Sequence, residues 1–150
     1  MKTTTVRKNS NASRWLIAGI VLVGVVLGAI FVPDGIKTPV SAGNNLPSNV
    51  TVEEAYHLRQ EGAFMLDVRR IDEWEQGHIP GATLIPLDEL GSRLDEVPRD
   101  QLVVVVCRSG NRSAEGRYIL FDAGFTQVTS MDGGMISWQA MGYETISGLQ

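Results

Sequence analysis

The single cysteine of the chain, Cys107, is followed at once by a polar run that contains two arginines, two serines, an asparagine and a glycine. It directly follows the uninterrupted apolar run Leu102–Val106, and the sequence predicts a helix from Arg112. Free N–H groups at a helix N-terminus and nearby arginines stabilise a thiolate over a thiol. A cysteine that only closes a strand in the core would be followed by apolar residues. We therefore predict that Cys107 is a reactive nucleophile.

Charged residues at the end of a second predicted strand are the expected neighbours of this loop. Asp67 and Arg69 lie where a short apolar run ends, and Glu73 follows four residues after Arg69. Because ligands bind beyond the carboxyl ends of parallel strands, these side chains are expected beside the cysteine. We interpret them as ion pairs that support the loop, with Asp67 as the leading candidate to pair with Arg112.

Alternating short strands and helices must position these residues. The β-branched run Leu102–Val106 is typical of a strand buried on both faces of a parallel sheet. Thr51 and Glu54 form a capping box that starts a helix through Gln60. Leu87–Val97 has apolar residues spaced three, four and three apart, which predicts one continuous helix. The other predicted strands span 63–68, 83–85 and 127–130, and the other predicted helices span 72–76, 112–123 and 134–141. This alternation predicts an α/β domain with a central, mainly parallel sheet flanked by helices.

A long uncharged segment precedes the domain. Trp15–Val32 has eighteen residues without a charge, a helical length of about 27 Å that matches the hydrocarbon thickness of a bilayer. Basic residues lie only on its N-terminal side, so residues 1–14 are expected in the cytoplasm and the domain outside it. We predict an uncleaved transmembrane anchor; the alternative is a signal peptide cleaved near Ala42, which would release a secreted domain. Residues 33–48 are predicted to be a flexible linker to a domain over residues 49–150.

The charge distribution and the cysteine count exclude several classes of function. Four basic and no acidic residues precede Pro33. From Gly43 onward, eight arginines and no lysine stand against sixteen Asp or Glu, which leaves eight net negative charges. An acidic domain does not suit the backbone of a nucleic acid, so no nucleic-acid partner is expected. One cysteine allows neither an intrachain disulfide nor a zinc site of several cysteines.

Three separate sequence motifs follow one another between residues 49 and 143. They are Leu66–Arg69 with Glu73-Trp74 and Gly77–Ala82, the loop Cys107–Ser113, and Gly133-Gly134 followed by Trp138. In order and spacing they resemble the signatures of the rhodanese-like family, and the resemblance implies a single domain of that fold.

The resemblance also implies a sulfurtransferase that works in two steps. The Cys107 thiolate attacks the sulfane sulfur of a donor such as thiosulfate, and the resulting persulfide passes this sulfur to cyanide, sulfite or another thiol. The loop residues expected to bind the substrate and the persulfide are Arg108, Ser109, Gly110, Asn111, Arg112 and Ser113. No metal ion or organic cofactor is expected, and a redox or sulfur-accepting protein is a possible partner besides the small donor and acceptor.

Two rival functions would use the same cysteine. Phosphatases and arsenate reductases related to this fold carry Cys-x5-Arg, whereas Cys107 and Arg112 form Cys-x4-Arg. The smaller loop favours sulfur over phosphate or arsenate. A persulfide carrier without turnover, or a partner-binding module, stays open as the alternative because it would carry the same nucleophile.

Overall fold

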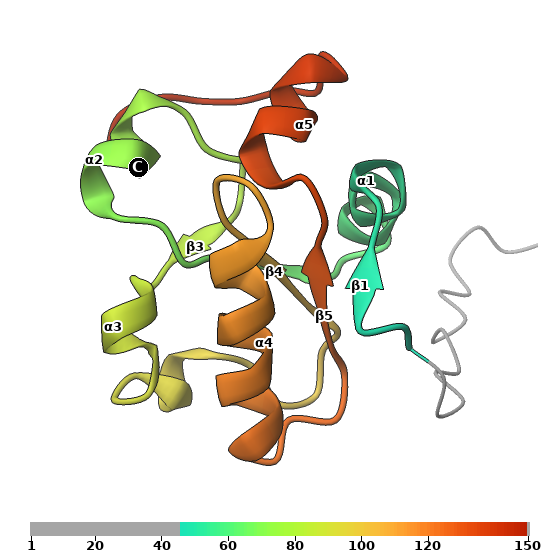
Figure 1. Ribbon diagram of the computed structural model, residues 1–150, viewed down its shortest axis with the longest axis vertical. Helices are drawn as coiled ribbons and strands as arrows, with labels where there is room; N and C mark the ends of the chain where they lie inside the picture. Colours follow the sequence, from blue (N-terminus) through green and yellow to red (C-terminus); the bar gives the residue numbers. More distant parts are fainter. Residues whose placement is uncertain (1–45, 150) are drawn as a thin grey trace, which may run out of the picture. The chain divides into compact units, whose positions relative to one another are not determined.

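Five short parallel strands form the centre of the computed structural model, which describes residues 46–149 (Figure 1). The strands are β1 (Asn49–Val50), β2 (Phe64–Asp67), β3 (Thr83–Leu84), β4 (Val103–Val106) and β5 (Val128–Met131). Their order in the sheet is β1-β5-β4-β2-β3, and every strand pairs with its neighbours in parallel. The predicted α/β domain with a mainly parallel sheet is confirmed.

Helices cover both faces of this sheet. The helices are α1 (Val52–Gln60), α2 (Ile71–Gln76), α3 (Leu87–Leu90), α4 (Asn111–Asp122) and α5 (Gly134–Ala140), with a 3-10 turn at Leu94–Glu96. Leu90 of α3 and Leu120 of α4 belong to one buried cluster, whereas Ala55 of α1 and Trp138 of α5 belong to a second. The sheet separates these two clusters, so Cys107 at its edge rests on a core that is packed from both sides.

The central strand β4 shows why its sequence is an uninterrupted run of valines. Val103 and Val105 pack into the cluster under α3 and α4, and Val104 and Val106 pack into the cluster under α1 and α5. All four are fully buried. Burial of each such side chain contributes about 1.5–3 kcal/mol relative to exposure. The strand therefore holds the residue that follows it, Cys107, at a fixed place.

The predicted continuous helix over Leu87–Val97 is wrong. The helix α3 ends at Leu90, and the chain reaches Leu94–Glu96 only after a turn that begins at Gly91. Glycine is disfavoured inside helices, and the hydroxyl of Ser92 donates to the backbone oxygen of Glu89, which competes with the helical pattern. The apolar periodicity survives because both short segments turn their apolar residues toward the same core.

The C-terminal segment forms backbone hydrogen bonds with α2 and with the chain that follows it. The backbone N–H groups of His78 and Ile146 each donate to the other residue's carbonyl, at 2.8 and 2.9 Å. The N–H of Gly148 donates to the backbone oxygen of Glu75. The ring of His78 stacks on Trp74, with 3.5 Å between the ring centroids. These contacts hold α2 in place beside the carboxyl edge of the sheet.

The predicted transmembrane segment, Trp15–Val32, lies outside the described residues, as do residues 1–14 and most of the predicted linker. The anchor and the extracytoplasmic location of the domain therefore stay predictions. From residue 46 to residue 149, no helix has the length and apolar character needed to span a bilayer.

Candidate active site

Cys107 directly follows β4, and its side chain is almost fully buried, with 1% of its surface exposed. The backbone N–H of Gly110 donates to its sulfur at 3.1 Å, and the thiol lies 3.6 Å from the hydroxyl oxygen of Ser113. That hydroxyl donates to the backbone oxygen of Gly110 at 2.7 Å. Gly110 has a φ of 106°, which only glycine adopts at low cost. The loop thus curls around the sulfur and directs an N–H group at it.

The N-terminus of α5 supports the loop through backbone hydrogen bonds. The N–H of Met135 donates to the backbone oxygen of Cys107 at 2.8 Å, and the N–H of Ile136 donates to that of Arg108 at 3.1 Å. Gly134 lies so close that an added Cβ would be 2.4 Å from the carbonyl oxygen of Cys107. These bonds satisfy carbonyl groups of the loop and fix its orientation. The sequence does not predict these bonds directly, because backbone groups make them. The pair Gly133-Gly134 is the one sequence feature that is associated with them.

Asp67 and Arg69 form a buried ion pair with each other, not with the loop. The guanidinium of Arg69 makes bonds of 2.7–3.0 Å to both carboxylate oxygens of Asp67. It also donates to the backbone oxygens of Glu73 and Gly77, at 3.1 and 2.8 Å. The predicted pairing of Asp67 with Arg112 is therefore wrong. Arg69 is only two residues along the chain, and its side chain turns back onto Asp67 at the end of β2.

Glu73 is the residue that engages Arg112. Two bonds of 2.7 Å join the two ends of the guanidinium to the two carboxylate oxygens, across 39 residues of sequence. This pair links α2 to the first turn of α4, directly after the loop. The Arg112 guanidinium holds the pKa of the Glu73 carboxyl below its usual range, and Glu73 raises the pKa of Arg112. Glu73 was predicted to support the loop, but its partner was not identified.

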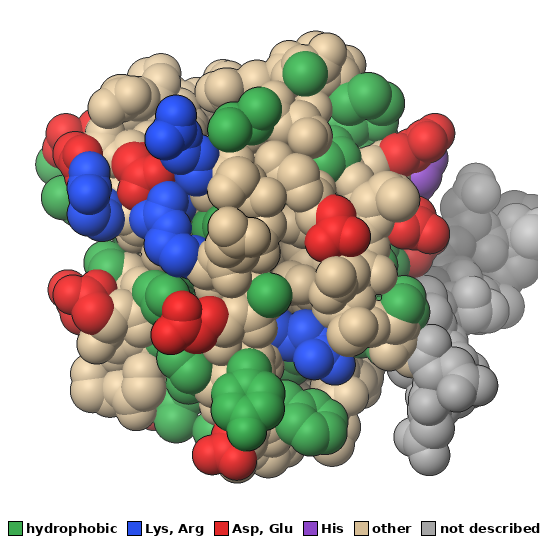
Figure 2. All heavy atoms as spheres, in the orientation of Figure 1, with side chains coloured by type: hydrophobic (Ala, Val, Ile, Leu, Met, Phe, Trp, Pro, Cys, Tyr) green, Lys and Arg blue, Asp and Glu red, His purple; other side chains and the backbone are tan. Residues whose placement is uncertain are grey.

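Arg108 is the exposed cation of the loop. It is the one arginine between residues 46 and 149 whose side chain has neither a hydrogen bond nor an ion pair to another residue of that range. It lines an open hollow of about 890 Å³, together with Glu73, Arg112 and the apolar Leu87. Figure 2 shows basic and acidic side chains gathered on this face, over α2 and the loop before α4. Ser109 and Asn111 are exposed as well.

The arrangement can stabilise an anion on the sulfur of Cys107, because a loop N–H group and the N-terminus of the twelve-residue α4 point toward it. Over residues 46–149, no three of the His, Cys, Asp and Glu side chains come together in a way that could hold a metal ion. The chemistry that these residues support is that of a nucleophilic thiolate.

The ion pair between Glu73 and Arg112 predicts a dependence of stability on pH. Since the pKa of folded Glu73 lies below its ordinary value of 4.5, the pair stabilises the fold above about pH 4.5 and is lost as the pH falls through the lowered pKa. Glu73→Gln is expected to lower the free energy of unfolding by about 1 kcal/mol at pH 7. Urea unfolding at several pH values should show this difference shrinking below pH 4.5; a constant difference would contradict the assignment.

The family model of the rhodanese-like domain matches residues 51–141. The chain belongs to the rhodanese-like family. The match includes β2, the cysteine loop and the Gly133-Gly134 turn, which are the segments that build the site described above.

Several known proteins are similar to the chain over most of the described domain. A thiosulfate sulfurtransferase, GlpE, from Pseudomonas syringae pv. syringae is 35% identical over 97 residues, which are 64% of this chain and 92% of the relative. A putative sulfur carrier protein, YrkF, from Bacillus subtilis is 37% identical over 78 residues, 52% of this chain and 42% of the relative. The crystal structure of a rhodanese-related protein from Thermoplasma volcanium is 28% identical, with a TM-score of 0.64, and the match covers 68% of this chain and all of that protein.

Proposed function

We propose that this rhodanese-like protein is a sulfurtransferase that carries sulfane sulfur as a persulfide on Cys107 and takes it from a donor such as thiosulfate. The observation that carries the proposal is the 3.1 Å bond from the N–H of Gly110 to the cysteine sulfur, inside a loop held at the N-terminus of α4. This arrangement favours the thiolate as nucleophile and then the anionic persulfide. Relatives that are named as a sulfurtransferase and as a putative sulfur carrier support the same chemistry.

The proposed reaction has two displacement steps. In the first, the Cys107 thiolate forms a bond to the outer sulfur of thiosulfate, the sulfur–sulfur bond of the donor breaks, and sulfite leaves with its electron pair. In the second, an acceptor such as cyanide or a thiolate bonds to the outer sulfur of the persulfide, and Cys107 leaves as the thiolate. Arg108, which has no partner within residues 46–149, is the side chain placed to attract the anionic donor.

The test is the mass of the intact protein after treatment with thiosulfate and removal of the excess. The protein is expected to gain the mass of one sulfur atom, and cyanide should remove it. Cys107→Ser should gain no mass, and its rate of thiocyanate formation should be lower by on the order of a thousandfold or more. Circular dichroism of the variant serves as the control for folding. A folded wild-type protein that gains no sulfur would refute the proposal.

The role of a carrier without turnover is the second candidate, favoured by the similarity to the putative sulfur carrier from B. subtilis. The same assay separates the two roles. An enzyme releases many equivalents of thiocyanate per protein molecule from thiosulfate and cyanide, whereas a carrier that is loaded only by its protein partner forms none from thiosulfate and releases one equivalent after that partner has loaded it.

We also infer that Trp15–Val32 anchors the chain in a membrane, with the domain on the outer side. The support is the uncharged length of this segment and the four basic residues that precede it. In this setting the acceptor is a thiol or protein that reaches the outer surface.

A further inference from the structure

Four arginines line the hollow beside the cysteine loop, and three of them already have a carboxylate partner. The ion pairs are Arg69–Asp67, Arg70–Asp72 and Arg112–Glu73. Only Arg108 has no counter-ion among the described residues. Asp88 and Glu115 line the same hollow; both are exposed, and neither has an ion pair within residues 46–149. Although the site is rich in arginine, it therefore offers little net positive charge to a ligand.

The pair between Glu73 and Arg112 differs from the pair at the outer edge of the hollow. The side chains of Arg112 and Glu73 are 32% and 16% exposed, whereas those of Arg70 and Asp72 are 72% and 55% exposed. Both ends of the Arg112 guanidinium point at the Glu73 carboxylate, each at 2.7 Å. This bidentate geometry is the strongest form of an arginine–carboxylate contact, and it commits the positive charge of Arg112 to Glu73.

Arg112 is also the loop cation whose release from its ion pair would affect the reaction most. It lies in the first turn of α4, five residues after the cysteine, and the Cys107 thiolate is close enough to contribute to its raised pKa. An arginine freed at this position would add one positive charge beside the reacting sulfur. The Glu73 carboxylate, which is ionised at neutral pH, prevents this through its two bonds of 2.7 Å to the guanidinium.

We propose that Glu73 sets the charge of the sulfur donor: by engaging Arg112 it leaves Arg108 as the single free cation of residues 46–149 beside Cys107, so that the site prefers sulfane-sulfur donors with one negative charge over doubly charged ones. The inference rests on the proposed sulfur transfer and makes it more specific. Thiosulfate, a dianion, is then a poorer substrate for this site than a donor with one negative charge. Sulfate, also a dianion, is a weak competitor. The acidic surroundings act in the same direction, because they repel a dianion more strongly than a monoanion.

Thiosulfate and methanethiosulfonate are a matched pair of donors for the test. Both present a sulfane sulfur on an oxidised sulfur atom, but thiosulfate carries two negative charges and methanethiosulfonate one. With methanethiosulfonate, Cys107 forms its bond to the outer sulfur, the sulfur–sulfur bond breaks, and methanesulfinate leaves with the electron pair. The quantity measured is kcat/KM for methanethiosulfonate divided by kcat/KM for thiosulfate, because a general loss of activity cancels in this ratio.

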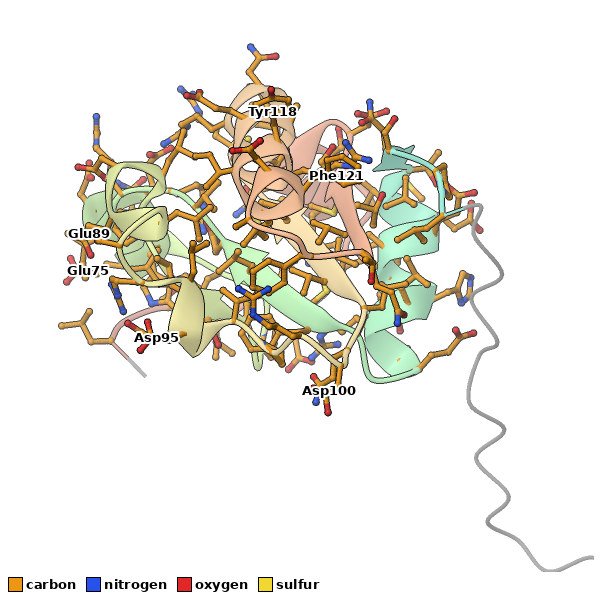
Figure 3. All side chains as sticks on the ribbon, turned by 90° about the horizontal axis from the view of Figure 1, so that it is seen from below. Glu75, Glu89, Asp95, Asp100, Tyr118 and Phe121 are labelled. Carbon is orange, nitrogen blue, oxygen red and sulfur yellow. The ribbon has the colours of Figure 1, made fainter. Side chains whose placement is uncertain are left out.

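Glu73→Gln is expected to lower this ratio about tenfold, since one additional charge-assisted contact to the dianion has at least that effect. The matched control is Glu75→Gln, which removes the same charge from an exposed side chain on the same helix (Figure 3) and should leave the ratio within about twofold. In the double variant Glu73→Gln/Arg112→Gln the ratio should return to the wild-type value. A ratio unchanged in Glu73→Gln, or equally low in the double variant, would overturn the proposal.

Arg112→Gln provides a test that does not depend on the folding of the Glu73 variant. It leaves the Glu73 carboxylate unpaired in the hollow, and the ratio should rise because the dianion is then repelled further. An unchanged or lower ratio in this variant contradicts the proposal.

Protection of Cys107 from alkylation by iodoacetamide, a neutral reagent, tests anion binding without any sulfur transfer. Sulfate should protect Glu73→Gln at about a tenfold lower concentration than it protects the wild type. If no sulfur transfer is found but this shift is, the proposed function fails while the charge preference stands. If transfer occurs without any shift, the charge preference fails alone.

Discussion

Asp67→Ala is expected to destabilise the domain by about 3–5 kcal/mol, because it leaves the guanidinium of Arg69 buried without its counter-ion. Arg69 and Asp67 are 4% and 1% exposed, and no water can replace the lost carboxylate at low cost. The two remaining bonds of Arg69, to the backbone oxygens of Glu73 and Gly77, do not neutralise its charge. Urea unfolding of the variant and the wild type at pH 7 measures the difference.

Asp72→Ala is the matched control for this experiment. Asp72 also pairs with an arginine, Arg70, at 2.7 Å, but both side chains are more than half exposed. Exposed ion pairs contribute little, so this variant should be nearly as stable as the wild type. A loss in Asp67→Ala no greater than that in Asp72→Ala would show that burial of the first pair is unimportant. Replacing both Asp67 and Arg69 by apolar residues of similar volume should restore much of the stability.

Gly134→Ala is expected to disrupt the cysteine loop, with a loss of at least about 2 kcal/mol in stability and at least about tenfold in sulfur transfer. The φ of Gly134 is 55°, and an added Cβ would lie 2.4 Å from the backbone oxygen of Cys107 and 2.5 Å from the carbonyl carbon of Arg108. Backbone atoms cannot rotate away as a side chain can, so the loop or α5 must move. The bond from Met135 to the Cys107 carbonyl is then lengthened or lost.

Gly142→Ala separates this clash from the cost of the backbone conformation. Gly142 has a φ of 73°, also in the left-handed region, but an added Cβ there meets no atom within 4 Å. We expect a loss of about 1 kcal/mol and unchanged sulfur transfer. Thermal unfolding and the thiosulfate–cyanide assay on both variants provide the measurements. Equal effects on sulfur transfer would mean that the contact of Gly134 with the loop is not critical.

Local patterns in the sequence were sufficient to predict the place of the Cys107 loop after a buried strand and most of the elements around it. The capping box at Thr51 and Glu54 is present in the structure, and the run of valines does form a strand buried on both faces. Both signals depend on residues that are close in sequence. The strand β1 was missed because two residues, Asn49–Val50, are too few to show a period.

The partners of the charged residues could not be predicted in the same way. Asp67, Arg69, Glu73 and Arg112 were all expected near the loop, but which carboxylate meets which arginine depends on side-chain direction and on the position of α2. That position is set by tertiary contacts, among them the bonds between His78 and Ile146, which no local pattern reveals. The single wrong pairing, Asp67 with Arg112, follows from this.

The pairing of β1 with β5 has a consequence for how the polypeptide folds during synthesis. Asn49 and Val50 find their partners in Ser130 and Met131, about eighty positions later, and the N–H groups of α5 that hold the loop come later still. A nascent chain that has emerged only through Cys107 therefore exposes its valine-rich central strand without a completed sheet. Contacts so distant along the chain form slowly. The domain is thus expected to become resistant to protease only once its last helix has left the ribosome or the translocation channel, and to be vulnerable to aggregation until then.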